Sequence, residues 1–185
     1  MQKDIDIIIY GATGFTGQLC VKYFQSLNTG VKWAIAGRDQ EKLQKVALDN
    51  SVDVEILIAD SDDEAALDIL TSRATVILST TGPFHRYGSK LVASCVKNSA
   101  NYVDITGENF WVKGLIAKHH EEASEKGIRI IPSCGYDSIP SDLGVFYSAK
   151  ALKKPIKRIE SFHSWEGGAS GGTLETMFSM GDLDL

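Results

Sequence analysis

The sequence predicts an α/β fold, in which helices cover both faces of a doubly wound parallel sheet of the Rossmann type. Short β-branched runs alternate with longer amphipathic segments along most of the 185 residues. The runs are almost continuously hydrophobic, as is typical of parallel strands buried on both faces. A glycine-rich turn follows the first run. We expect six strands, at residues 5–10, 32–36, 54–59, 75–80, 102–106 and 128–132.

The helices expected between these strands have their own signals. After the first strand, one apolar face repeats at helical spacing and should pack on the sheet. It consists of Leu19, Cys20, Tyr23, Phe24 and Leu27. These positions predict a helix between the first two strands.

Residues that favour helix ends delimit two later helices. Ser61 and Glu64 have capping-box spacing, which predicts a helix that begins there and runs towards Arg73. Gly127 is expected to end a helix that begins near Trp111, as a left-handed cap.

The C-terminal part has a different pattern. Pro140 suits the first turn of a helix that continues to Leu152, and Pro155 prevents its extension. A strand is expected at 158–165, followed by a glycine-dense stretch and a further helix. We therefore expect a Rossmann domain at 1–153, and at 154–185 the beginning of a second α+β domain that the chain does not complete.

Composition limits the classes of partner. The formal net charge is −5, and Lys and Arg do not cluster, which argues against a nucleic-acid surface. The three cysteines are far apart and lack CxxC spacing, as expected of a reduced, cytoplasmic protein without a metal site. His119 and His120 are expected on the polar face of their helix rather than at a metal. No apolar run has the length of a signal peptide or a membrane span.

The glycine-rich turn carries the strongest functional signal. Its spacing is G-x-x-G-x-x-G, directly after a strand and before a helix, which is the context of a dinucleotide fingerprint. Such a backbone can approach a pyrophosphate closely and offer it helix N-terminal amides. A purely structural turn is the alternative. The predicted contacts are Gly11, Thr13, Gly14, Phe15, Thr16 and Gly17.

The end of the second strand bears on which dinucleotide binds. An NAD-binding protein places an Asp or Glu about 20 residues beyond the glycines, whereas here Gly37 is followed by Arg38. Arg38, helped by Lys42, can pair with the 2′-phosphate of NADP(H). Asp39 keeps NAD(H) open as the less favoured cofactor. Asp60, after the third strand, is a further predicted contact.

Chemistry-bearing residues also follow the later strands. The loops at 80–88, 104–108 and 133–140 should meet beyond the carboxyl ends of the strands, where such sheets bind ligands. Tyr87, Asp104, Cys134 and Asp137 are candidates for proton relay or substrate contact. Simpler roles stay open for three of them: packing for Cys134, loop hydrogen bonds for Asp104 and a helix cap for Asp137.

The motifs, taken in order, resemble the saccharopine dehydrogenase-like oxidoreductases, which include saccharopine reductases and trans-acting enoyl reductases. The resemblance covers the whole chain. The motifs are Tyr10-Gly-Ala-Thr-Gly-Phe-Thr-Gly17, Gly37-Arg38, Gly82-Pro83-Phe84 with Tyr87-Gly88, Tyr102-Val-Asp-Ile-Thr-Gly-Glu108, Cys134-Gly-Tyr-Asp-Ser-Ile-Pro140 and Ser170-Gly-Gly-Thr173.

This resemblance implies hydride transfer between nicotinamide and a small-molecule or lipid-type substrate. It implies that the second domain forms much of the substrate pocket and the contact of a homodimer. Peripheral association with lipid droplets or membranes is implied by some relatives alone. Residues placed by the resemblance near the nicotinamide and its ribose are Thr80, Gly82, Pro83, Thr106, Gly107, Cys134 and Gly135.

Two other functions fit the glycine turn. A short-chain dehydrogenase pairs a catalytic Tyr with a Lys four residues later, but Tyr87 with Lys90 and Tyr147 with Lys150 are three apart. The second is a non-catalytic NADP(H) sensor, with an apolar partner surface near 162–165.

Overall fold

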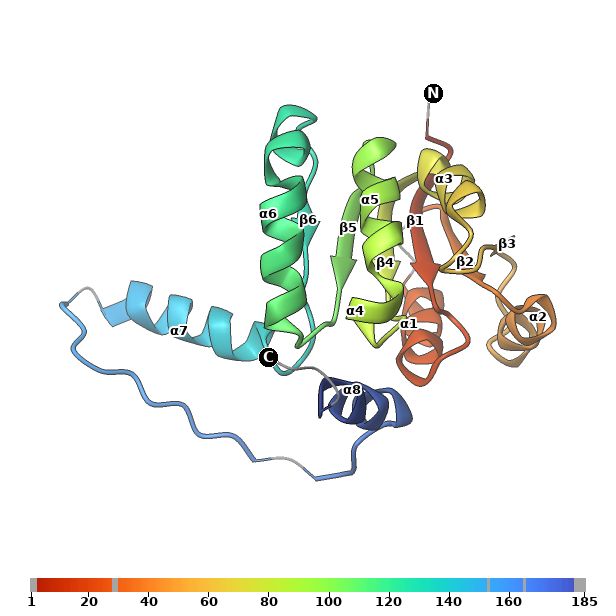
Figure 1. The fold of residues 1–185 in the computed structure, drawn as a ribbon. Coiled ribbons are helices and arrows are strands. Elements are labelled where there is room, and N and C mark those ends of the chain that lie inside the picture. Colours follow the sequence, from red (N-terminus) through yellow and green to blue (C-terminus); the bar gives the residue numbers. More distant parts are fainter. Residues whose placement is uncertain (1–2, 28–29, 153, 165, 182–185) are drawn as a thin grey trace.

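The computed structural model describes residues 3–27, 30–152, 154–164 and 166–181 (Figure 1). Its centre is a parallel sheet of six strands in the order β3-β2-β1-β4-β5-β6. The chain moves outward from β1 to β3, and then crosses back to β4 and continues to β6 on the other side. This order is that of the doubly wound nucleotide-binding sheet, so the predicted fold class is confirmed.

All six strands lie where the hydrophobic runs predict them, with ends that differ by at most two residues. The register is parallel throughout; Ile9, for example, pairs with Ile35 on one side and Leu78 on the other. The strands are β1 (Ile5–Tyr10), β2 (Trp33–Gly37), β3 (Glu55–Ile58), β4 (Ala74–Ser79), β5 (Asn101–Asp104) and β6 (Ile130–Ile131).

Helices cover both faces of the sheet and separate its core into two clusters. One cluster packs beneath α1 and α2, and the other beneath α3, α5 and α6. The helices are α1 (Phe15–Ser26), α2 (Gln40–Asp49), α3 (Glu64–Arg73), α4 (Phe84–Tyr87), α5 (Ser89–Lys97), α6 (Asn109–Glu125), α7 (Ile139–Leu152) and α8 (Gly171–Gly181).

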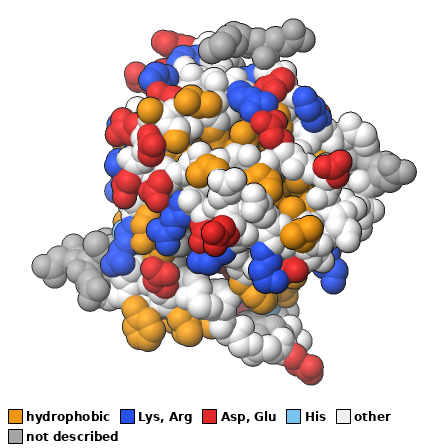
Figure 2. All heavy atoms as spheres, turned by 90° about the vertical axis from the view of Figure 1, so that its right-hand side faces the viewer, with side chains coloured by type: hydrophobic (Ala, Val, Ile, Leu, Met, Phe, Trp, Pro, Cys, Tyr) orange, Lys and Arg blue, Asp and Glu red, His pale blue; other side chains and the backbone are white. Residues whose placement is uncertain are grey.

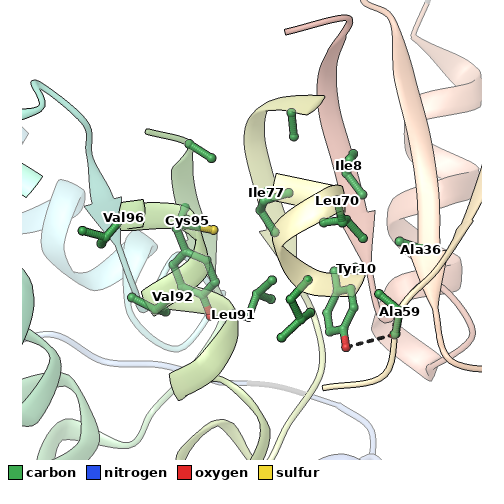
Figure 3. Packing of buried hydrophobic residues seen from close by; sticks show 14 of the residues in the cluster. Ile8, Tyr10, Ala36, Ala59, Leu70, Ile77, Leu91, Val92, Cys95 and Val96 are labelled. Atoms are coloured by element: carbon green, nitrogen blue, oxygen red, sulfur yellow. Dashed lines mark hydrogen bonds between the residues drawn. The ribbon is translucent and has the colours of Figure 1, made fainter. Parts of the chain in front are cut away.

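The second cluster shows how the sheet binds its helices (Figure 3). Side chains of Ile8 and Ile77 from the strands meet Leu70 of α3 and Leu91 of α5, all nearly or fully buried. The hydroxyl of Tyr10 donates to the carbonyl of Ala59, 3.2 Å away. Burial raises the pKa of Tyr10, so this phenol stays neutral and serves as a donor.

The packed face of α1 differs from the one that the apolar spacing predicts. Val21 is fully buried and Phe24 packs against the core, but Leu19 and Tyr23 are more than half exposed. The prediction that Leu19, Tyr23 and Leu27 pack on the sheet is wrong. The buried Gly17 lets the first turn of α1 lie directly against the glycine-rich turn, and in this orientation Val21 faces the core in place of Leu19.

The start of α3 also differs from the capping-box prediction. The cap is Asp63, whose carboxylate accepts the backbone N–H of Ala66 at 3.0 Å, and Ser61 lies in the preceding turn. The helix ends at Arg73 as expected. A carboxylate accepts this hydrogen bond more strongly than a hydroxyl does. Its negative charge also interacts favourably with the positive end of the helix dipole.

This assignment can be tested by stability. Replacing Asp63 by alanine removes the cap and is expected to lower the free energy of unfolding by about 1 kcal/mol. The matched change Ser61→Ala should alter it by less than about 0.5 kcal/mol. Urea unfolding of both variants gives the two free energies of unfolding. A larger loss of stability in Ser61→Ala than in Asp63→Ala would support Ser61 as the cap instead.

The end of α6 follows the prediction. Gly127 has a φ of +64°, and the N–H groups of Gly127 and Ile128 donate to Ser124 and Ala123 at the helix end. His120 is exposed as expected, but His119 is only 8% exposed and faces an apolar groove beside β6, so its polar-face prediction is wrong. Leu115, one turn earlier on the same face, explains this burial.

The C-terminal segment matches the predictions only in its helices. Both α7 and α8 form, but residues 158–164 are not a strand, so that prediction is wrong for them; Trp165 lies outside the described residues. Strand pairing needs a neighbour, and this segment runs alone below the domain (Figure 1). Helix α7 buries none of its residues, and Phe162 is 91% exposed.

Charged side chains of both signs mix on the side of the molecule that carries α2 (Figure 2). Several are paired, for example Lys45 with Asp49 at 2.8 Å and Arg73 with Glu55 at 2.6 Å. Among the described residues, no helix is both long and apolar enough to cross a bilayer.

Candidate nucleotide-binding site

The glycine-rich turn joins β1 to α1 in a conformation that requires glycine. Gly11 has a φ of +84°, which side chains rarely adopt. A Cβ atom on Gly17 would lie 2.2 Å from the carbonyl oxygen of Gly11. The two glycines therefore let the turn fold tightly against the first turn of α1, with the N-terminus of that helix facing outward.

Residues of this turn line a cavity of about 320 Å³. It lies beyond the carboxyl ends of β1, β2 and β4, where this type of sheet binds ligands. Helix α8, which lies below α4 in Figure 1, contributes Gly172 and Glu175 to its lining. The lining residues are Tyr10, Gly11, Thr13, Gly14, Phe15, Thr16, Gly37, Arg38, Ser61, Thr80, Thr81, Gly82, Tyr87, Ser170, Gly172 and Glu175.

A second cavity of about 270 Å³ continues the first. The two share Thr16, Thr80, Gly82, Ser170 and Gly172, so they form one groove across the ends of the central strands. The other residues that line the second cavity are Phe84, Ile105, Gly107, Glu108, Asp137, Thr173, Thr176 and Met177.

The groove fits an elongated dinucleotide. The glycine turn and Arg38 line its first end, and a helix N-terminus and an arginine suit a pyrophosphate and a 2′-phosphate. Thr81 also lines this end, and its hydroxyl is buried without a hydrogen-bond partner in the described structure. An unpaired buried hydroxyl is costly, and a polar ligand group would satisfy it.

Two predicted contacts of the adenosine end lie elsewhere. Lys42 is exposed and pairs with Asp39 at 3.1 Å, and the carboxylate of Asp60 accepts the backbone N–H of Asp62. Neither side chain lines the groove, whereas Arg38 does. Arg38 is therefore the cation that the fold places at this end of the groove.

Asp104 ends β5 and is only 1% exposed. Its Oδ1 atom accepts the N–H groups of Thr106 and Ser133, at 3.0 and 2.9 Å. Its Oδ2 atom accepts the hydroxyl of Tyr102 at 2.8 Å. Burial raises the pKa of Asp104 above its usual range, although these hydrogen bonds oppose the shift. Asp104 thus holds together the two loops that end β5 and β6.

Because the pKa of Asp104 is higher in the folded than in the unfolded chain, its ionisation opposes folding. The stability of the protein relative to Asp104→Asn should fall as pH rises from about 4 through the folded pKa. An asparagine keeps one acceptor for the two amides and donates to Tyr102, so the variant should fold. Urea unfolding of both proteins between pH 4 and pH 8 measures the two stabilities. If the unchanged protein becomes more stable relative to Asp104→Asn as pH rises, the assignment is contradicted.

The other candidates for chemistry occupy different positions. Tyr87 lines the first cavity, and the exposed Asp137 lines the second. Cys134 lines neither; its thiol donates to the carbonyl of Ile131 at 3.4 Å, and burial raises its pKa, which favours the unreactive thiol.

Four predicted cofactor contacts support the wall of the groove rather than line it. Gly17 and Pro83 are buried beneath it. Thr106 is buried and its hydroxyl accepts the N–H of Glu108. Gly135 lies where a Cβ atom would be 2.9 Å from the carboxylate of Asp137.

The structure also reveals a residue that sequence reasoning missed. Glu108 is fully buried at the second cavity. Its carboxylate accepts the N–H groups of Phe84 and His85, and His85 Nδ1 lies 2.7 Å from Oε2. The available signal was an acid four residues after the end of β5, next to Gly107. Within the part of the chain that the structure describes, no cluster of His, Cys, Asp or Glu could hold a metal ion.

Comparisons with known proteins agree with this geometry. The chain is 40% identical over 148 residues to a trans-acting enoyl reductase of Mycobacterium bovis, covering 78% of this chain and 35% of that protein. It is 35% identical to a lipid droplet localized protein of Caenorhabditis elegans, covering 93% and 44%. It is also 35% identical to a saccharopine dehydrogenase-like oxidoreductase of Rattus norvegicus, covering 92% and 43%. The chain thus spans less than half the length of these curated relatives.

A solved structure shows the same fold. Apo saccharopine dehydrogenase (L-Glu forming) from Saccharomyces cerevisiae superposes with a TM-score of 0.67 at 18% identity, over 80% of this chain and 31% of that one. The model of the saccharopine dehydrogenase NADP-binding domain matches residues 7–131, from β1 to β6. The chain therefore belongs to the saccharopine dehydrogenase NADP-binding domain family.

Proposed function

We propose that the protein binds NADP(H) along this groove, as part of an oxidoreductase that transfers hydride to or from a small-molecule or lipid-type substrate. The observation that carries the proposal is the continuous groove from Arg38, over the glycine turn, to Gly107 and Asp137. The names of the relatives, an enoyl reductase and an oxidoreductase, support the reaction class.

In this proposal the turn at 11–17 and the N-terminus of α1 bind the pyrophosphate, and Arg38 binds the 2′-phosphate. Bound NADPH supplies the hydride. Tyr87 and Asp137 are proposed to contact substrate or pass a proton, because both side chains line the groove. Asp104 is proposed to hold the loops of the nicotinamide end through its buried hydrogen bonds.

Residues 154–185 are proposed to begin a second domain. Helix α8 forms one wall of the groove through Gly172 and Thr173, together with Ser170 just before it. Helix α7 exposes Phe146, Tyr147 and other apolar side chains, as is typical of a surface that packs against another domain or subunit. In this proposal the substrate pocket and any homodimer contact lie on this side of the molecule.

The proposal is tested by calorimetric titration of the protein with NADPH and NADH. We expect binding of both with a clear preference for NADPH; absence of binding by either would refute the oxidoreductase proposal. An assay of NADPH oxidation with α,β-unsaturated acyl thioesters then separates the two functions that share this site. Tight binding with no turnover of any substrate would favour the sensor.

A further inference from the structure

We infer that Glu108, together with His85, is a positioning pair that fixes the nicotinamide end of the groove by holding α4. The inference rests on the proposed NADP(H) site and concerns two residues to which that proposal assigns no role. It follows from where the first amides of α4 find their hydrogen-bond acceptors.

Helix α4 has four residues and cannot hold itself in place. Its N-cap, Pro83, provides no side-chain hydrogen bond. Instead, the N–H groups of Phe84 and His85 donate to Oε1 and Oε2 of Glu108, at 2.8 and 2.7 Å. The acceptor therefore comes from a loop more than twenty residues further along the chain.

The imidazole of His85 adds a third bond to the same carboxylate. Its Nδ1 atom lies 2.7 Å from Glu108 Oε2, and its side chain is 12% exposed. An ionised carboxylate can only accept hydrogen bonds, so beside it the ring takes the tautomer that carries a proton on Nδ1 and donates from there. Three N–H groups thus surround a carboxylate with no exposure to solvent, where hydrogen bonds to charge are strong.

Glu108 is itself held in place from β5. Its N–H donates to the hydroxyl of Thr106 at 3.1 Å, and the N–H of Thr106 donates to Asp104 at 3.0 Å. The carbonyl of Glu108 accepts the first amides of α6, from Trp111 and Val112. The carboxylate is therefore a rigid support on which α4 rests.

The position of α4 matters because its flanks line the groove. Phe84 begins it and lines the second cavity, Gly82 lies just before it and borders both cavities, and Tyr87 ends it and borders the first cavity. A shift of α4 would move these residues while leaving the glycine turn and Arg38 in place. Because the pair holds Phe84 and His85 at the start of α4, its loss should weaken contacts in the second cavity, at the nicotinamide half of the cofactor, more than contacts with Arg38 and the glycine turn.

The fold has a second attachment for this region, so variants of the pair should remain folded. Trp111 donates through Nε1 to the hydroxyl of Ser89 at 2.9 Å, and its ring packs 5.9 Å from that of Phe84. These contacts do not involve the carboxylate of Glu108. They keep α4 near α6 when the carboxylate is changed.

The first test compares Glu108→Gln with the unchanged protein, using NADPH and 2′,5′-ADP as probes. Glutamine retains the shape but turns one N–H group towards an N–H donor. We expect about tenfold weaker binding of NADPH, the loss that follows from one hydrogen bond to a charged group. Binding of 2′,5′-ADP, which has only the adenosine half, should change less than about twofold.

A matched pair at His85 keeps the inference falsifiable if Glu108→Gln fails to fold. Asparagine can place its amide N–H where Nδ1–H lies, and alanine cannot. His85→Asn should therefore bind NADPH more tightly than His85→Ala, while both bind 2′,5′-ADP alike. Equal NADPH affinity in these two variants, or a parallel loss for both probes in any variant, would overturn the inference. If the unchanged protein binds 2′,5′-ADP but not NADPH, the nicotinamide site itself is refuted; if it binds neither, the NADP(H) proposal fails instead.

Discussion

Replacing Gly17 by alanine is expected to abolish nucleotide binding. The new Cβ atom would lie 2.2 Å from the carbonyl oxygen of Gly11 and 2.8 Å from Cα of Ala12, both of them backbone atoms that cannot rotate away. The turn would have to open, and the amides at the start of α1 would leave the pyrophosphate. Loss of two hydrogen bonds between these amides and the charged pyrophosphate is expected to weaken NADPH binding by at least about a hundredfold.

Calorimetric titration measures this loss, and Gly114→Ala is its matched control. Gly114 lies on an exposed side of α6, where an added Cβ atom meets nothing within 4 Å. That change should leave NADPH binding intact and stabilise α6 by up to about 1 kcal/mol. Near-normal affinity in Gly17→Ala would mean that the cofactor does not approach this turn.

Arg38→Ala is expected to remove the preference for NADPH over NADH. Arg38 lines the first cavity beside Gly37, and its guanidinium is suited to bidentate contact with a phosphate. NADH lacks the 2′-phosphate, so only NADPH loses this contact. We expect about thirtyfold weaker NADPH binding and less than about a twofold change for NADH.

Lys42→Ala serves as the control for charge alone. Lys42 carries the same charge, but it pairs with Asp39 and does not line the cavity. Its replacement should weaken NADPH binding less than about threefold, and this small effect should vanish with added salt. If both variants lose the same amount of NADPH affinity, binding depends only on the net charge near the site, and Arg38 makes no specific contact with the cofactor.

The local sequence pattern was sufficient to predict the strands of the sheet and the alternation of strands and helices along the chain. Parallel strands buried on both faces leave long apolar runs, so each of the six strands lies where its run predicts it. The end of α6 was equally local, because Gly127 takes a conformation that few other residues adopt. Predictions failed where several apolar residues of one helix could have faced the core and tertiary packing determined which of them did. On α1, Val21 is buried and Leu19 is exposed.

The segment at 158–164 failed for a different reason. Its β-branched and aromatic residues suit a strand, but a strand needs a neighbour to accept its backbone hydrogen bonds. The described structure provides none beside it, so the pattern alone could not produce the element.

By itself, the sequence determined the fold class, the glycine-rich turn after β1 and the basic residue that follows β2, because each depends on residues close together in the chain. Tertiary structure alone decided that Arg38 rather than Lys42 faces the groove, and that Glu108 supports α4. The bonds from Glu108 join residues 23 and 24 positions apart. No local pattern specifies such a contact, since it forms only when the ends of β4 and β5 meet at one edge of the sheet.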